Sequence, residues 1–151
     1  APFPDLTPNA AASCLHAPGK ERIDQIEKVE LWTYGYAFGI LNKVGPLANF
    51  ADRDHCLQYV AAIGLIFGRL TAEDYEDHIA ADGRIDPLRA KTVVYEDKRY
   101  SSGFLDPQLR SNANAIRVHF KDGSSTKSRR QNTIIGRRRA TTLQMAQHDT
   151  P

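Results

Sequence analysis

One short stretch of the sequence gathers several hydrogen-bonding and ionisable side chains. Arg53, His55, Gln58 and Tyr59 all fall within residues 51–60, ADRDHCLQYV. On a helix, residues three and four positions apart lie on the same side, so His55, Gln58 and Tyr59 would share one face. Such a group could hydrogen-bond a carboxylate. Alternatively, it could satisfy the end of its own helix and nearby backbone, as buried polar groups commonly do.

Other residue types that support catalysis or metal binding occur without a specific spacing. Clusters of ligand-type side chains occur at Cys14/His16, at residues 52–55 and at Asp74/Asp77/His78. None of them has a recognised metal-site spacing, so we expect solvated charges and helix caps, with no bound metal. Two cysteines are too few for a disulfide framework, and we expect reduced thiols in an intracellular protein.

The residues that follow the polar cluster are almost entirely apolar. Positions 59–67 carry only apolar and small side chains, and a helix that is apolar on all sides must be buried. We therefore expect one core helix within residues 51–70. Asp52 or Asp54 would cap its first turn, and Gly68 would end it because glycine accepts a left-handed backbone.

The remaining patterns predict short strands and helices interspersed along the chain. Apolar and polar residues alternate at 27–34 and 115–121, which indicates strands. Asp122-Gly123, after the second strand, predicts a hairpin. Two further strands are expected, a return strand at about 125–135 and a strand at 92–96. Helices are expected at 72–81 (opened by a Thr71/Asp74 capping box), 86–91 and 9–15. Residues 36–44 could form a short helix or an irregular segment, and residues 97–111 a loop that could include a helical turn at 107–110.

Together these elements predict an α+β fold. We expect a small mixed domain with a buried central helix, short helices and an antiparallel sheet that ends in a hairpin. The length of 151 residues suits a single domain, which we place at residues 1–136. No apolar run approaches the roughly 18 residues of a membrane span, and the N-terminal residues lack a signal-peptide pattern.

Basic residues are concentrated at the C-terminal end of the chain. Residues 121–151 hold seven Lys or Arg against two Asp, although the whole chain has a net charge of only +2. We expect residues 137–151 to form a basic, disordered tail. Such a tail could bind phosphate or nucleic acid by charge. It lacks the interleaved aromatic residues that stack on bases, so we expect no nucleic-acid partner.

Several motifs in the middle of the chain resemble the C-terminal domain of the MmgE/PrpD family, which includes 2-methylcitrate dehydratase. The specific residues are Gly45-Pro46-Leu47, the run DRDHC at 52–56, and Gln58-Tyr59. The likeness extends over residues 43–126, and a weaker likeness reaches back to Phe3-Pro4. Agreement over a block of this length is too specific to arise by chance.

The resemblance implies part of a lyase of propionate catabolism. The family's dehydratase, in the methylcitrate cycle, removes water from 2-methylcitrate to give 2-methyl-cis-aconitate and has no iron–sulfur cluster, so no cofactor is expected. Its chemistry is acid–base work at a carbon next to a carboxylate. The resemblance implies that Arg53 and His55 offset substrate charge, and that Gln58 and Tyr59 donate hydrogen bonds to the substrate.

The family's main acid–base residues belong to a larger helical domain that precedes the resembling region and is absent from these 151 residues. No catalytic residue is therefore assigned here, and we expect this chain alone to be inactive. The resemblance implies that the chain covers the substrate cleft, binds a tricarboxylate only together with the helical domain, and forms a homodimer in the complete enzyme. It also implies an intracellular protein of the cytoplasm or the mitochondrial matrix.

A second hypothesis remains beside the enzymatic one. Histidines that the family commonly carries near Phe3-Pro4, near Tyr34 and in the terminal strand are missing from this sequence. The chain would then be a non-catalytic dimerisation or anion-binding module from a truncated or diverged paralogue. In that case the DRDH residues would cap the helix or form a dimer contact.

Overall fold

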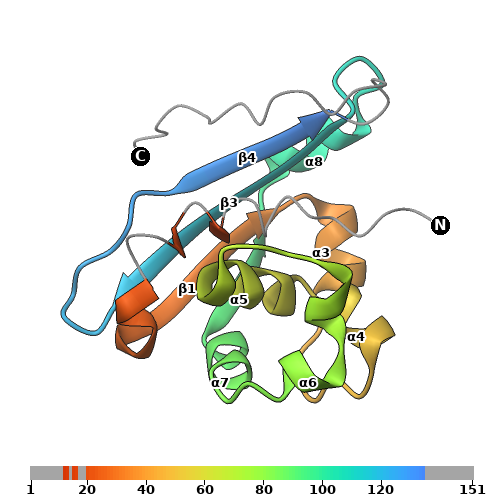
Figure 1. Cartoon of the computed structure of the whole chain (residues 1–151). Coiled ribbons are helices and arrows are strands. Elements are labelled where there is room, and N and C mark those ends of the chain that lie inside the picture. Colours follow the sequence, from red (N-terminus) through yellow and green to blue (C-terminus); the bar gives the residue numbers. More distant parts are fainter. Residues whose placement is uncertain (1–11, 14, 17–19, 135–151) are drawn as a thin grey trace.

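The centre of the fold is a mixed four-stranded sheet (Figure 1). The structure is a computed structural model that describes residues 12–13, 15–16 and 20–134. The strand order is β2-β1-β3-β4. The strands are β1 (Ile26–Thr33), β2 (Thr92–Glu96), β3 (Ser111–Phe120) and β4 (Arg129–Ile134). Strand β1 pairs in parallel with β2 and antiparallel with β3, and β3 pairs antiparallel with β4. The α+β class is confirmed, with a sheet that is mixed because helices carry the chain from β1 to β2.

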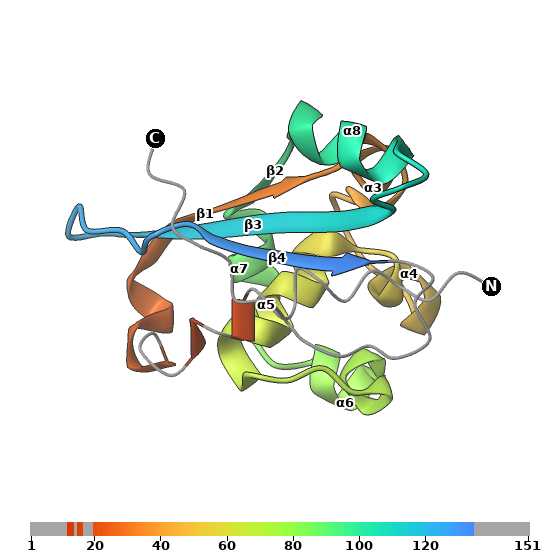
Figure 2. The ribbon, with the colours of Figure 1, turned by 90° about the horizontal axis from the view of Figure 1, so that it is seen from above.

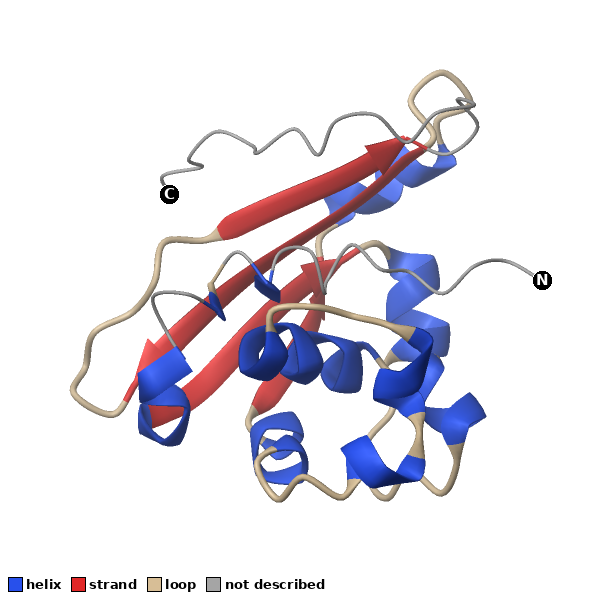
Figure 3. Ribbon diagram, in the orientation of Figure 1, coloured by secondary structure: helices blue, strands red, loops and turns tan. Residues whose placement is uncertain are grey.

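Short helices connect and cover these strands (Figure 3). The helical elements are η1 (Lys20–Gln25), α3 (Gly35–Leu41), α4 (Phe50–Asp54), α5 (Leu57–Phe67), η2 (Ala72–Tyr75), α6 (Asp77–Ala80), α7 (Ile85–Ala90) and α8 (Lys98–Leu105). Figure 2 shows α5 and α7 on one side of the sheet and α8 on the other. No helix among the described residues is long and apolar enough to cross a membrane.

The core lies between α5 and the inner face of the sheet. All residues of α5 except the last are buried, as its apolar composition predicts. Val29, Leu31 and Thr33 of β1 have no exposed surface, in agreement with the alternation in the sequence. Gly68 ends α5 at φ +69°, where its predicted left-handed conformation is confirmed.

The predicted single core helix is in fact two helices. The chain turns at His55, and Cys56 is extended (φ −124°, ψ 110°) before α5 begins. The Asn49 side chain caps α4, and no side-chain cap is present on α5, so the proposed capping of the core helix by Asp52 or Asp54 is wrong. The two halves need different surroundings: α5 is buried, whereas three of the residues in α4 are charged.

Two other predictions also need correction. The helix expected at 72–81 is divided into η2 and α6 because Glu76 is extended. The loop expected at 97–111 contains α8, which Asp97 caps by accepting from the Arg99 N–H at 2.9 Å. Two serines and a glycine within α8 weaken its helical signal.

The other expected elements fare as follows. The strands expected at 27–34 and 92–96 are confirmed, and α7 begins close to the predicted start of its helix. The hairpin turn lies at Asp122-Gly123 with Gly123 at φ +86°, and β4 begins at Arg129, later than the predicted start of the return strand. Of the helix expected at 9–15, positions 12 and 13 are helical, whereas 9–11 and 14 lie outside the described residues, as does the tail 137–151.

Candidate functional site

Two of the four predicted site residues line one polar pocket. Its volume is about 210 Å³, and it lies where α4, α5, α6 and α7 meet. The lining residues are Leu47, Arg53, Tyr59, Asp77, Ala80, Ala81 and Asp86. The pocket thus combines a guanidinium, a phenol and two carboxylates, contributed by elements that follow one another along the chain.

Arg53 is the cation of this pocket and is almost completely buried. Its Nη1 donates to the Tyr75 carbonyl oxygen at 2.7 Å and pairs with Asp77 Oδ1 at 2.8 Å. The Arg53 side chain is 8% exposed, whereas the Asp77 side chain is 89% exposed. The guanidinium is therefore fixed by backbone on its buried side, and its counter-ion is a solvated carboxylate that can swing away.

Tyr59 lies beside Arg53 and is fixed in a similar way. Its buried hydroxyl donates to the Asp74 carbonyl oxygen. Burial raises the pKa of Tyr59 to about 12. The phenol therefore stays protonated at neutral pH and cannot act as a base. Because its one proton is donated to the Asp74 carbonyl, it can donate to a ligand only by turning from that carbonyl.

His55 and Gln58 point to other surroundings. The His55 side chain is exposed, and its Nδ1 contacts the Asp54 carboxylate and the Ala51 carbonyl at 3.1 Å. Gln58 is buried, and its Nε2 donates to Asn42 Oδ1 at 2.6 Å. The prediction that His55, Gln58 and Tyr59 share a single helix face is wrong because the helix breaks between His55 and Leu57. Their roles toward a substrate stay predictions.

Sequence reasoning missed the acidic side of the pocket. Asp77 and Asp86 face the Arg53–Tyr59 pair from α6 and α7. In the sequence, Asp77 stands out only as a potential metal ligand, and Asp86 only as the start of a helix. Among the described residues, no three His, Cys, Asp or Glu side chains gather as metal ligands would. Cys14 lies outside the described residues.

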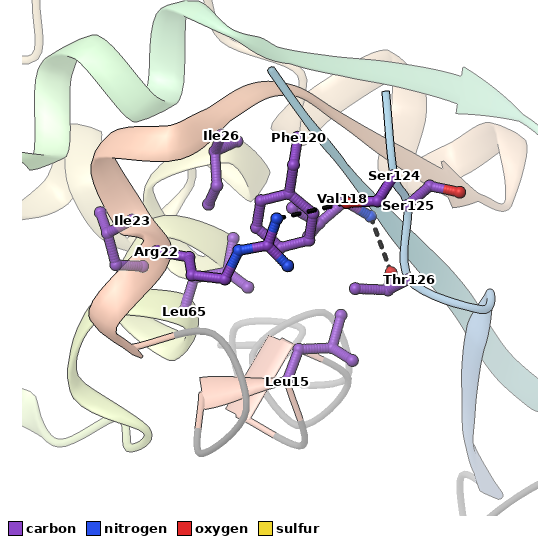
Figure 4. A pocket seen from close by; sticks show the side chains of 10 residues that line it. All are labelled: Leu15, Arg22, Ile23, Ile26, Leu65, Val118, Phe120, Ser124, Ser125 and Thr126. Atoms are coloured by element: carbon purple, nitrogen blue, oxygen red, sulfur yellow. Dashed lines mark hydrogen bonds between the residues drawn. The ribbon is translucent and has the colours of Figure 1, made fainter. Parts of the chain in front are cut away.

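A second pocket is apolar and has a different lining (Figure 4). Its volume is about 190 Å³, and residues such as Ile26, Leu65 and Val118 line its interior. The Arg22 guanidinium carbon lies 3.8 Å from the centre of the Phe120 ring, and Arg22 Nη2 pairs at 2.9 Å with Asp122 Oδ2 in the hairpin turn. Because aliphatic side chains line its interior and the Arg22 side chain is 40% exposed, whereas Arg53 is almost completely buried, this pocket offers mainly apolar contacts.

The polar pocket is therefore the better candidate for binding a ligand. A buried guanidinium can hold a carboxylate by charge-assisted hydrogen bonds, and the neutral phenol can add a hydrogen bond when its proton turns from the Asp74 carbonyl. The Tyr59 phenol, with a pKa of about 12, is not suited to removing a proton at neutral pH. The chemistry of the described part of the pocket is therefore that of a site that could bind and orient an anion once Asp77 turns away.

Comparisons with known proteins agree with the resemblance in the sequence. The family model of the MmgE/PrpD C-terminal domain matches residues 9–149. The chain is 53% identical over 110 residues to 2-methylcitrate dehydratase of Salmonella typhimurium and 51% identical over 110 residues to that of Escherichia coli. It is 49% identical over 115 residues to the mitochondrial 2-methylcitrate dehydratase of Yarrowia lipolytica.

These matches cover most of the chain but a small part of each relative. They include 73%, 73% and 76% of the chain, and 23%, 23% and 22% of the three relatives. The chain thus spans less than a quarter of the length of these curated relatives. The family match and the sequence identities together show that the chain belongs to the MmgE/PrpD family, in the region of its C-terminal domain.

Proposed function

We propose that this chain is the C-terminal domain of a lyase that removes water from 2-methylcitrate to give 2-methyl-cis-aconitate. The observation that carries the proposal is the 53% identity to a 2-methylcitrate dehydratase over 73% of the chain. The polar pocket supports it, because a substrate with three carboxylates needs buried cationic and hydrogen-bonding groups. Arg53 and Tyr59 supply one of each.

In the proposed reaction, a proton leaves the carbon next to a carboxylate and hydroxide leaves the neighbouring carbon. Arg53 pairs with a substrate carboxylate after Asp77 swings toward solvent, and the Tyr59 hydroxyl turns its proton from the Asp74 carbonyl to the same carboxylate. Charge that develops on the carboxylate as the proton leaves is then stabilised by a fixed guanidinium. His55, at the exposed end of α4, helps to offset substrate charge, and Gln58 adds a hydrogen bond if its contact with Asn42 rearranges.

The groups that remove the proton and protonate the leaving hydroxide come, in this proposal, from the remainder of a longer protein. We propose that this remainder includes a helical domain across the pocket and that the complete enzyme is a homodimer. An intracellular location, in the cytoplasm or the mitochondrial matrix, is proposed by analogy with the relatives, of which the Yarrowia enzyme is named as mitochondrial. On this proposal the chain alone does not catalyse dehydration.

The second candidate is a non-catalytic dimerisation module. Apolar side chains on α3 and α8 face solvent: Tyr36 is 59% exposed, Ile40 49% and Leu105 76%. Exposed apolar groups of this kind favour association with another surface. Light scattering tests this candidate, because a dimerisation module self-associates without any other domain and loses that property when Ile40 and Leu105 are both changed to Ser.

Turnover of 2-methylcitrate by the full-length gene product that carries this chain tests the leading proposal. Product formation is followed by the ultraviolet absorbance of the new conjugated double bond. We expect Arg53→Gln to raise KM by roughly 10- to 100-fold, because a charged hydrogen bond is worth about 1.5–3 kcal/mol. Arg84→Gln is the matched control, since Arg84 pairs with Asp82 outside the pocket. A full-length protein with no dehydratase activity would overturn the proposal.

A further inference from the structure

The two binding groups of the polar pocket depend on a single short turn. The carbonyl oxygen of Asp74 accepts from the Tyr59 hydroxyl, and that of Tyr75 accepts from Arg53 Nη1 at 2.7 Å. These two carbonyls are consecutive and end the 3-10 helix η2. Any displacement of η2 therefore moves the anchors of both binding groups together.

The position of η2 is set in turn by the buried carboxylate of Asp74. Its Oδ2 accepts from the Thr71 N–H at 2.7 Å and from Thr71 Oγ1 at 3.0 Å, and its Oδ1 accepts from Arg69 at 3.0 Å. The Asp74 side chain has no exposed surface. A buried carboxylate is costly unless hydrogen bonds and a counter-charge compensate it, and both are present here.

A four-residue 3-10 helix has few internal hydrogen bonds to hold its shape. The Asp74 side chain therefore connects the start of the turn, at Thr71, to the carbonyls at its end. Asp74 itself is not among the residues that line the pocket. Its effect on a ligand would pass through Arg53 and Tyr59.

We infer that Asp74 is a positioning residue: by fixing η2, it places the Arg53 guanidinium and the Tyr59 hydroxyl at the spacing that receives a substrate carboxylate. The identity of that ligand rests on the proposed function. The geometric part, that the Asp74 side chain holds Arg53 and Tyr59 in place, does not.

The test compares Asp74→Ala and Asp74→Asn in the full-length gene product. Alanine removes every bond of the carboxylate, whereas asparagine keeps an oxygen that accepts from Thr71 and loses only the pairing with half-exposed Arg69. We expect Asp74→Ala to raise KM for 2-methylcitrate about tenfold with kcat changed less than about twofold, because small displacements of binding groups weaken binding strongly. Asp74→Asn should restore KM to near the parent value.

Asp97→Ala supplies a matched control. Asp97 also caps a helix, accepting from the Arg99 N–H and from Arg99 Nη2, both at 2.9 Å, but α8 contributes no residue to the pocket. Loss of this cap should leave KM unchanged. If Asp74→Ala behaves like Asp97→Ala, with an unchanged KM, its role is only structural and the inference is wrong.

A crystal structure of the Asp74→Ala protein gives a readout that does not depend on activity. We expect the Arg53 Nη1 to Tyr75 oxygen distance to exceed 2.7 Å and the Tyr59 hydroxyl to leave the Asp74 carbonyl. Unchanged contacts would overturn the inference. If the parent protein does not dehydrate 2-methylcitrate, the proposed function fails and this structure alone decides the positioning role. If the alanine variant does not fold, Asp74→Asn combined with Thr71→Val takes its place in both measurements.

Discussion

Two buried tyrosines beside the pocket allow a sharp test of its hydrogen bonding. Tyr59 and Tyr75 are 2% and 5% exposed, and their rings stack with centroids 6.0 Å apart. The Tyr59 hydroxyl donates to the Asp74 carbonyl. The Tyr75 hydroxyl is buried with no hydrogen-bond partner among the described residues. The same change, Tyr to Phe, should therefore have different effects at neighbouring positions.

Tyr59→Phe removes the donor to a buried carbonyl, and we expect a loss of about 1–3 kcal/mol in the free energy of unfolding. Tyr75→Phe removes a buried hydroxyl that makes no bond, so stability should stay the same or rise by about 1 kcal/mol. With a urea m-value of about 1–3 kcal/mol/M, a difference of about 2 kcal/mol separates the unfolding midpoints by roughly 1 M. Equal midpoints, or a larger loss for Tyr75→Phe, would refute the hydrogen-bond assignment.

Three further predictions concern charge, backbone and pH. Asp77→Asn removes the counter-ion of Arg53, so citrate should bind the full-length protein more tightly by calorimetry, and weaker binding would show that Asp77 contacts the ligand favourably. Gly68 has φ +69°, and Gly68→Ala would also place a Cβ 2.8 Å from the His16 side chain, so thermal unfolding should show the protein destabilised by at least about 1–2 kcal/mol. Gly39→Ala, whose Cβ would have no atom within 4 Å, should leave stability unchanged. Burial raises the pKa of both buried tyrosines from 10 to about 12, so their stabilisation is present below pH 10 and lost as the pH rises toward 12. A variant with phenylalanine at both positions should flatten this loss in denaturant titrations, and an equally steep loss would contradict it.

Local patterns in the sequence predicted the elements whose burial follows a regular period. In β1, buried and more exposed residues alternate, and α5 is buried on all sides, so both elements are visible as patterns of apolar residues in the sequence. The break between α4 and α5 is not visible in the sequence. It goes with the contacts of Arg53 with Tyr75 and Asp77, which lie more than twenty positions away along the chain. A continuous helix satisfies local propensity equally well, so only the tertiary contact distinguishes the two.

The same limit applies to the pocket. Residue type was sufficient to select Arg53 and Tyr59, but the helical spacing that grouped Tyr59 with His55 assumed an unbroken helix. Asp77 and Asp86 enter the pocket through the packing of α6 and α7, which no spacing in the sequence encodes. Asp74 had a visible signal as part of a capping box, but its consequence for the pocket depends on two backbone carbonyls.

In the proposed function, the Arg53–Tyr59 pocket receives a carboxylate of the substrate. The most direct measurement is a crystal structure of the full-length gene product with bound citrate, a stable analogue of 2-methylcitrate. We expect a citrate carboxylate within hydrogen-bond distance of both the Arg53 guanidinium and the Tyr59 hydroxyl, with Asp77 turned away. Citrate bound elsewhere, with Arg53 and Asp77 still paired at 2.8 Å, would contradict it.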